Sequence, residues 1–275
     1  MKYSKASSVV SIVLASLFAF PSWALTECKD LPNHATLQQA LRNSIFPTAA
    51  LDNGGFNLNM WATIVNRDGQ VCAVAFSGDN RGEQWPGSRV ISGQKANTAN
   101  AFSLPGLALS TANLWAATQP GGSLFGLQFS NPVDTAVAYG TAGHAGGTAR
   151  NYGRRNDPLR GNQVGGVNVF GGGLALYDSA GTLLGAVGVS GDSSCADHNI
   201  AWRVRDTLGL DFVPGGVGAL GDNIIFDLVD DAGSNPESPS GFGHPECGVG
   251  TPDAADNAAI VAGCPLGDGA TAGCI

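Results

Sequence analysis

The chain has 275 residues, of which 13% are charged, and 22 acidic against 14 basic residues give a net charge of −8. An acidic chain repels the phosphate backbone, and no stripe of basic and aromatic residues offsets this charge, which excludes nucleic acid as a partner. Glycine contributes 40 residues, which favours strands, turns and long loops over a helical bundle. The length suits one substantial domain or two small ones.

The N-terminus has the features of a secretory signal peptide. Lys2 and Lys5 precede an apolar run at 9–20, Pro21 ends that run, and 22–24 is a small-x-small pattern. Spanning a membrane needs roughly 20 apolar residues, so this run is too short, and no later stretch is long enough. We expect residues 1–24 to be removed, leaving a periplasmic or secreted protein without a membrane span and with a charge of 12 − 22 = −10. An uncleaved anchor is the alternative.

All six cysteines lie after the predicted cleavage site. An even number of cysteines in an exported chain indicates disulfides, although six cysteines allow 15 pairings. We predict that each bridge fastens a glycine-rich or terminal segment to firmer structure. The pairs are Cys28 with Cys72, Cys195 with Cys247, and Cys264 with Cys274. No spacing is C-x-x-C, which argues against a structural zinc.

The first half of the chain predicts a hairpin between helices. Apolar residues recur at helical spacing over 36–46, and Pro47 follows this predicted helix. Strands are predicted at 58–65 and 71–76, joined by a turn around Asp68-Gly69. A helix is expected at about 89–102 and a shorter one at 110–118.

Residues 119–166 are rich in glycine and poor in large aliphatic side chains. They also hold a basic cluster of Arg150, Arg154, Arg155 and Arg160. We interpret this stretch as a long surface insertion rather than a separate domain, because a loop of this length is usually functional or partly mobile.

The second half repeats the hairpin-plus-helix order. Strands are predicted at 174–177 and 183–189 and a helix at 195–208, with one further strand at 224–229. Residues 231–275 form a cysteine-bearing tail that we expect to be irregular apart from a helix at 254–261.

A short sequence pattern occurs in both halves of the chain. The pattern Ala-Val-x-x-Ser-Gly-Asp occurs at 73–79 and again at 186–192, each time on the second strand of a hairpin. Two such units predict an α+β fold, with a mostly antiparallel sheet of about five strands flanked by helices. A chance match of so short a pattern is the alternative.

The segment 188–203 is the most informative for function. Ser194 and Asp197 have capping-box spacing. Helical spacing then places His198, Trp202 and Arg205 on a common face. An imidazole, an indole and a guanidinium suit iron ligation, the covering of a planar ligand and the pairing of a carboxylate. The plainer interpretation is that Trp202 lies in the core and the two others face solvent.

Two parts of the sequence resemble the signatures of the GlcG/HbpS-like haem-binding family, also called PduO C-terminal-domain-like. The C-terminal signature is carried by Gly171-Gly172-Gly173, Tyr177-Asp178-x-x-Gly181, Gly185-Ala-Val-Gly-Val-Ser-Gly191 and Asp197. The other signature is carried by the helix with Lys95-Ala96-x-Thr98-Ala99-x-x-Phe102. The chain departs from the family where Ser77-Gly78-Asp79-Asn80 replaces the usual Arg-Met-Asp-Gly, and in its insertion and tail.

The resemblance implies a profilin-like layering of sheet and helices, assembly into homo-oligomers, and non-covalent binding of haem or a related planar tetrapyrrole. Haem needs an apolar slot, partners for its propionates and usually an axial ligand. Among the residues, His198 ranks first and His144 second as the metal ligand, and Lys95 is the candidate propionate partner. The absence of C-x-x-C-H excludes covalent attachment.

We therefore predict a domain at 25–230, with its insertion at 119–166, that sequesters or senses haem, with at most incidental peroxide-driven degradation of the haem. One alternative is a structural or interaction protein that keeps the scaffold without a ligand site. The other is a serine hydrolase using Ser193 or Ser190, although no G-x-S-x-G elbow is present.

Overall fold

The computed structural model describes residues 26–46, 52–140, 149–229, 236–249, 253–271 and 274. The predicted signal peptide therefore lies outside the described residues. The strands are β1 (Trp61–Asn66), β2 (Val71–Phe76), β3 (Gly173–Tyr177) and β4 (Leu183–Ser190). The main helices are α1 (His34–Ile45), α2 (Ser88–Phe102), α6 (Ser194–Thr207) and α7 (Asp253–Gly263), and the short ones are α3 (Trp115–Thr118), α4 (Leu127–Ser130) and α5 (Thr135–Tyr139).

The described strands form one antiparallel sheet in the order β2-β1-β4-β3. The α+β class is confirmed, with four strands in place of about five. Both predicted hairpins are present, and their turns depend on side chains that accept main-chain hydrogen bonds. Asn66 accepts from the N–H groups of Asp68 and Gln70, and Asp178 accepts from those of Ala180 and Thr182.

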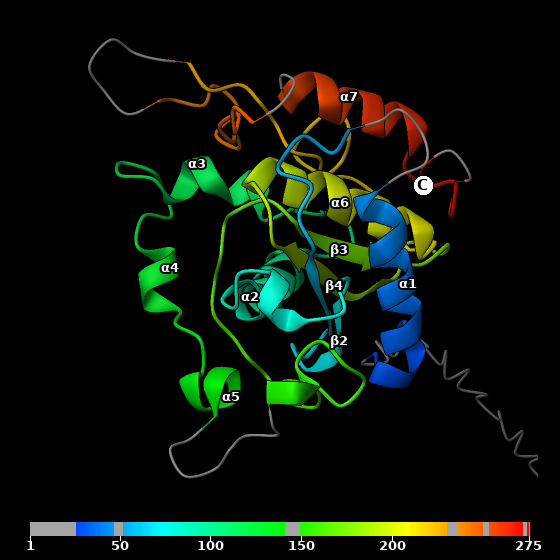
Figure 1. Ribbon diagram of the computed structural model, residues 1–275. Coiled ribbons are helices and arrows are strands. Elements are labelled where there is room, and N and C mark those ends of the chain that lie inside the picture. Colours follow the sequence, from blue (N-terminus) through cyan, green and yellow to red (C-terminus); the bar gives the residue numbers. More distant parts are fainter. Residues whose placement is uncertain are drawn as a thin grey trace, which may run out of the picture.

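Helices cover both faces of the sheet. On one face, α1 and α6 bury Leu41 and Trp202 against Ile64 of β1 in the larger hydrophobic cluster. On the other face, α2 buries Val90 in a second cluster that includes Val65 of β1. β1 therefore alternates its side chains between two buried layers, which explains why the whole strand is buried. In Figure 1, α7 lies alongside α6, on the outside of this layer.

The segment 119–166 was predicted to be a surface insertion, but its described residues contribute to the interior. Ala138, Leu159 and Val164 are buried in the cluster beneath α2. Asp157 makes a buried ion pair with Arg89 of α2, with Oδ1 of Asp157 2.5 Å from Nη2 of Arg89. The sequence did not predict this packing, because the few apolar residues of the segment are spread among many glycines and form no periodic pattern.

The predicted strand at 224–229 is wrong. No sheet strand forms there, because the main chain bonds to loops instead: the oxygen of Ile225 accepts from the N–H of His244, and that of Asn223 accepts from the side chain of Asn113. The free edge of β3 is partly paired with a loop, since the N–H of Tyr177 donates to the main-chain oxygen of Leu210.

The structure has all three predicted disulfides, Cys28–Cys72, Cys195–Cys247 and Cys264–Cys274. They join the segment that precedes α1 to β2, the start of α6 to the tail, and the end of α7 to the C-terminal residues. The predicted tail helix is present as α7. Among the described residues, no helix has both the length and the apolar character to cross a membrane.

The two tail disulfides close loops of different length, which gives a test of their contribution. They span 52 residues at Cys195–Cys247 and 10 residues at Cys264–Cys274. Loop-closure entropy predicts that the Cys→Ala pair at 195 and 247 lowers the free energy of unfolding by about 1.4 kcal/mol more than the pair at 264 and 274. Guanidinium titrations of the oxidised proteins measure this, and equal losses would show that local strain or packing dominates.

Candidate ligand-binding site

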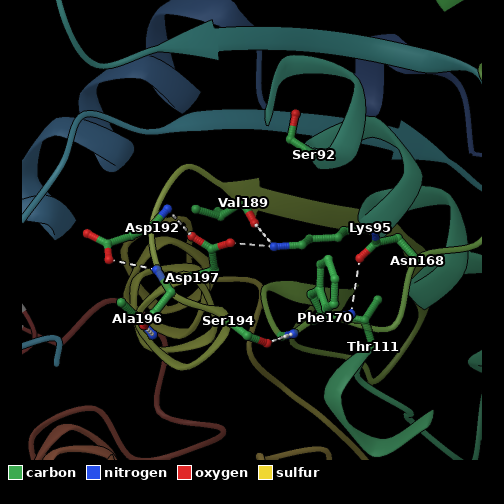
Figure 2. A network of polar contacts seen from close by, with 12 residues as sticks. Ser92, Lys95, Thr111, Asn168, Phe170, Val189, Asp192, Ser194, Ala196 and Asp197 are labelled. Atoms are coloured by element: carbon green, nitrogen blue, oxygen red, sulfur yellow. Dashed lines mark hydrogen bonds and ion pairs between the residues drawn. The ribbon is translucent and has the colours of Figure 1, made fainter. Parts of the chain in front are cut away.

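Lys95 of α2 and Asp197 of α6 form a buried ion pair where the two signature segments meet (Figure 2). Nζ of Lys95 lies 2.5 Å from Oδ2 of Asp197 and donates to the main-chain oxygen of Val189 at 3.0 Å. Oδ1 of Asp197 accepts from the N–H of Asp192 at 2.8 Å. The pair thus ties together α2, the end of β4 and the start of α6.

Burial sets the electrostatics of this pair. Loss of water lowers the pKa of the Lys95 ammonium, and the nearby Asp197 carboxylate opposes that shift. The same loss of water raises the pKa of Asp197 to about 6, against the opposing effects of Lys95 and the N–H of Asp192. Each charge depends on the other because neither has water to stabilise it. In this conformation the Lys95 ammonium contacts Asp197 and is not available for a propionate.

Glycines of the C-terminal signature allow the helices to approach this pair. A Cβ on Gly188 would overlap the main-chain oxygen of Ser92 in α2, and one on Gly173 would lie 2.5 Å from the oxygen of Lys95. Gly172 has a φ of 107°, which other residues rarely adopt. These glycines thus have a packing role that needs no ligand.

The start of α6 differs by one residue from the predicted capping box. Ser193, not Ser194, is the N-cap, and its hydroxyl accepts from the N–H of Ala196 at 3.1 Å. Asp197 reaches back to Asp192 instead of completing a box with Ser194. The Ser193 hydroxyl therefore caps the helix, which argues against a role as a nucleophile.

The common face predicted for His198, Trp202 and Arg205 is present. The rings of His198 and Trp202 are 6.2 Å apart, and the Arg205 guanidinium lies 4.7 Å from the Trp202 ring centre. All three face the interior. Arg205 makes two hydrogen bonds to Asp222, of 2.7 and 2.9 Å, and Trp202 donates to the main-chain oxygen of Cys264.

His198 is 0% exposed, and its Nε2 accepts from the N–H of Ile224 at 3.1 Å. Burial lowers the pKa of His198 to about 3, so the ring is neutral. The structure therefore does not bring His198, Trp202, Arg205 and Lys95 to a shared opening, and the role of His198 as an iron ligand stays a prediction that requires α6 to open. His144, the second predicted ligand, lies outside the described residues.

A serine and a histidine do meet at the start of α6. Oγ of Ser194 is 2.8 Å from Nε2 of His244 and also accepts from the N–H of Gly171. The other nitrogen of His244 faces the carbonyl of Pro245, where a catalytic triad has an orienting group such as a carboxylate. His244 is 2% exposed, and burial lowers its pKa to about 4. This arrangement is a structural contact rather than a hydrolase site.

The outer edge of β2 is covered by polar side chains instead of another strand. The carbonyl groups of every second residue of β2, at Cys72, Val74 and Phe76, point away from the sheet. They accept from Nε of Arg160, a ring nitrogen of His34 and the amide of Gln38, at 3.2, 2.9 and 2.9 Å. α1 and the segment around 150–160 are thereby held on either side of this edge.

Two cavities lie along this edge and a third adjoins the first, and together we call them the β2-edge groove. The first has a volume of about 490 Å³, the second about 370 Å³ and the third about 280 Å³. His34 lines the first and second, while Arg81 and Tyr152 line the first and third. Small-molecule sites have volumes of about 300–1,000 Å³, so the groove has the size of such a site.

The groove gathers most of the exposed positive charge of the described residues. Its first two cavities are lined by six exposed arginines, out of 14 basic residues in the chain: Arg42, Arg81, Arg150, Arg154, Arg155 and Arg160. In contrast, Arg89, Lys95 and Arg205 are buried in ion pairs. Among the described residues, Asp79 alone contributes a carboxylate to the lining of the first two cavities.

The third cavity is mainly apolar. Its walls include Trp61, Pro86, Val90, Tyr139 and Tyr152. Thus an aromatic slot adjoins a cationic one. The sequence did show the basic cluster within the insertion, but it gave no sign that α1 supplies His34 and Arg42 to the same place.

The model of the haem-degrading HbpS-like protein family matches residues 47–205. The chain belongs to this family. The match contains all four strands with α2, and α1 and the tail lie outside it. No curated protein matches.

Two solved structures are similar to this chain at a low level. One is described as a PduOC–haem complex, with 22% identity, a TM-score of 0.41, and coverage of 64% of this chain and 92% of the other. The other is the ORFY protein of Klebsiella pneumoniae, of the DUF336 family, with 21% identity, a TM-score of 0.38, and coverage of 75% and 96%.

Breaking the central ion pair tests its role. Replacing Lys95 with Met leaves the Asp197 carboxylate buried without its cation, so the free energy of unfolding should fall by about 3–5 kcal/mol. The double variant Lys95→Met, Asp197→Asn should lose clearly less than the sum of the single losses, as measured by urea unfolding. Glu27→Gln, which breaks the exposed pair with Lys29, serves as the control and should leave the midpoint unchanged. Additive losses would contradict a coupled pair.

Proposed function

We propose that this protein is exported and binds haem or a related tetrapyrrole non-covalently, as a haem-sequestering or haem-sensing protein that assembles into homo-oligomers. The observation that carries this proposal is the β2-edge groove, in which an aromatic slot adjoins a cluster of exposed arginines on an otherwise acidic chain. Membership of a family described as haem-degrading supports the choice of ligand.

The residues of the groove fit the chemical requirements of haem. A tetrapyrrole presents a flat apolar ring and two carboxylates. Tyr139 and Tyr152 offer aromatic surface for the ring, while Trp61 is buried, and Arg150 and Arg154 offer guanidinium groups for the carboxylates. Guanidinium binds a carboxylate through two parallel hydrogen bonds, which orients the ligand as well as attracting it.

The chain's own contribution is to bind and orient the ligand and to limit its contact with water. The ring of Tyr152 is held by the buried Arg89 guanidinium, 3.7 Å from its centre, and Arg89 is in turn fixed by Asp157. This stacked arrangement keeps one wall of the slot in place. Bound haem would supply the iron redox chemistry that the family description implies.

Titration with hemin tests the proposal. The oxidised mature protein should shift the Soret band of hemin and saturate at a fixed stoichiometry, because the groove removes the ring from water. Replacing both Arg150 and Arg154 with Gln should weaken binding about tenfold or more, since two charge-assisted contacts are lost. Size-exclusion chromatography of the same samples reports the oligomeric state.

A wild-type protein that leaves the hemin spectrum unchanged would exclude tetrapyrrole binding and favour a scaffold protein without a ligand. The matched control is Lys29→Gln, which removes an exposed positive charge that lines none of the three cavities. It should bind hemin as the wild type does.

Export is tested with the full chain expressed in a bacterium. The exported protein should lack residues 1–24 by mass spectrometry and show no thiol that reacts with maleimide, because the six cysteines are paired. Leu14→Arg interrupts the apolar run and should leave the full-length chain in the cytoplasm with reactive thiols. A full-length wild-type protein in the membrane fraction would instead indicate an uncleaved anchor.

A further inference from the structure

Three carboxylates meet where α6 ends, away from the β2-edge groove. Asp206, Asp211 and Asp268 each contribute one oxygen, and these oxygens all lie within 4.8 Å of one another. Asp206 is in the last turn of α6, and Asp211 lies in the following loop, beside β3. Asp268 comes from the loop that the Cys264–Cys274 disulfide closes. The cluster thus joins the core to the tail, outside the residues that match the family model.

The negative charges of this cluster are poorly compensated. Asp206 and Asp211 are each 2% exposed, and in the part of the chain that the structure describes, none of the three carboxylates forms an ion pair. Arg203 interacts electrostatically with Asp206, but its Nε and Nη1 donate to Asn53 and Cys274. Negative charge at the C-terminal end of a helix also opposes the helix dipole. Folding therefore brings these carboxylates together at a cost that a cation would remove.

The hydrogen bonds within the cluster do not satisfy all of its oxygens. Oγ1 of Thr271 lies 3.0 Å from a carboxylate oxygen of Asp206 and 3.0 Å from one of Asp268. It also lies 3.2 Å from the main-chain oxygen of Gly269. A hydroxyl has one proton to donate, so it cannot satisfy three acceptors at once. In addition, Oδ1 of the buried Asp211 has no hydrogen-bond partner among the residues described. This surplus of acceptors indicates a place for a cation.

The chemistry of the cluster suits calcium. Its atoms are all oxygens, which favour a hard cation such as Ca²⁺ or Mg²⁺ over zinc. Ca²⁺ takes carboxylate, carbonyl, hydroxyl and water oxygens at about 2.3–2.6 Å in flexible geometry, whereas Mg²⁺ needs a nearly ideal octahedron. Two oxygens on opposite sides of one Ca²⁺ are therefore about 4.6–5.2 Å apart, which accommodates the spacing of the three carboxylates.

We propose that Asp206, Asp211 and Asp268 bind a calcium ion that fastens the tail loop to the end of α6 and the neighbouring edge of the sheet. This site is independent of haem binding. It complements the Cys264–Cys274 disulfide, which closes the same loop covalently.

Calcium binding is tested on the oxidised mature protein after treatment with EDTA and removal of the chelator. Calcium sites of extracellular modules have a Kd of about 10⁻⁴–10⁻³ M, so about 10 mM CaCl₂ should raise the midpoint of thermal unfolding by about 3 °C or more. MgCl₂ at the same concentration and NaCl at the same ionic strength should give smaller rises, because Mg²⁺ needs stricter geometry and Na⁺ mainly screens charge.

Asp268→Asn removes the exposed ligand and leaves the buried part of the cluster in place. Its affinity for calcium, measured by titration calorimetry, should fall at least about tenfold, because calcium affinity depends on the number of charged ligands. The matched control is Asp68→Asn, the same change at an exposed aspartate in the turn between β1 and β2. It should keep the wild-type affinity.

Asp211→Asn separates metal binding from a purely structural role. The new amide oxygen can still accept from the N–H of Gly267, while its NH₂ group replaces the unpartnered oxygen and donates to the neighbouring carboxylates. Without calcium, this variant should unfold at a higher temperature than the wild type, and calcium should stabilise it by less than about 1 °C.

The assignment is overturned if the wild-type protein binds no calcium, or if Asp268→Asn and Asp211→Asn both keep the wild-type affinity. A calcium-free Asp211→Asn protein that unfolds at a lower temperature than the wild type would show that the carboxylate stabilises the fold without a metal. Equal stabilisation of the wild type by CaCl₂ and MgCl₂ would overturn the choice of calcium.

Discussion

The structure depends on the close packing of α2 and α6 at the end of β4. There Lys95 and Asp197 form an ion pair that is shielded from water. Burying two opposite charges is favourable only when both are present and well placed. Glycines at 173 and 188 make this placement possible, because any side chain there would occupy the space of the α2 main chain. The signature residues of the family therefore describe how two hairpin-plus-helix units are joined, and they need no ligand to explain them.

This constraint separates the stable interior from the surface available for binding. Lys95 and Arg205, the two basic residues that the sequence had offered as ligand partners, instead form buried ion pairs with Asp197 and Asp222. What remains exposed is a set of arginines along β2, brought together by α1 on one side and the 150–160 segment on the other. Because the chain as a whole is acidic, such a concentration of positive charge favours a small anionic ligand over an extended polyanion.

Several predictions from the sequence agree with the structure for clear physical reasons. The two hairpins follow from short, continuous apolar runs separated by turns of Asn, Asp and Gly, and α7 lies at the one stretch of the tail where a helix was expected. The strand expected at 224–229 failed because an apolar run gives no information on whether a free sheet edge is available to it. The 119–166 segment was judged by composition, which does not reveal that Asp157 reaches Arg89.

The sequence by itself determined the class of the fold, the presence of disulfides and the family, since these depend on local periodicity, cysteine parity and short glycine patterns. Which cysteines pair depends on the fold, because parity alone leaves 15 pairings open. The sequence also placed His198, Trp202 and Arg205 on one helix face. Only the tertiary structure decided that this face points inward and that His34 and the arginines at 150–160, more than a hundred residues apart, share one groove. Helical spacing fixes which side chains lie together, but the direction in which a face points depends on what the rest of the chain packs against it.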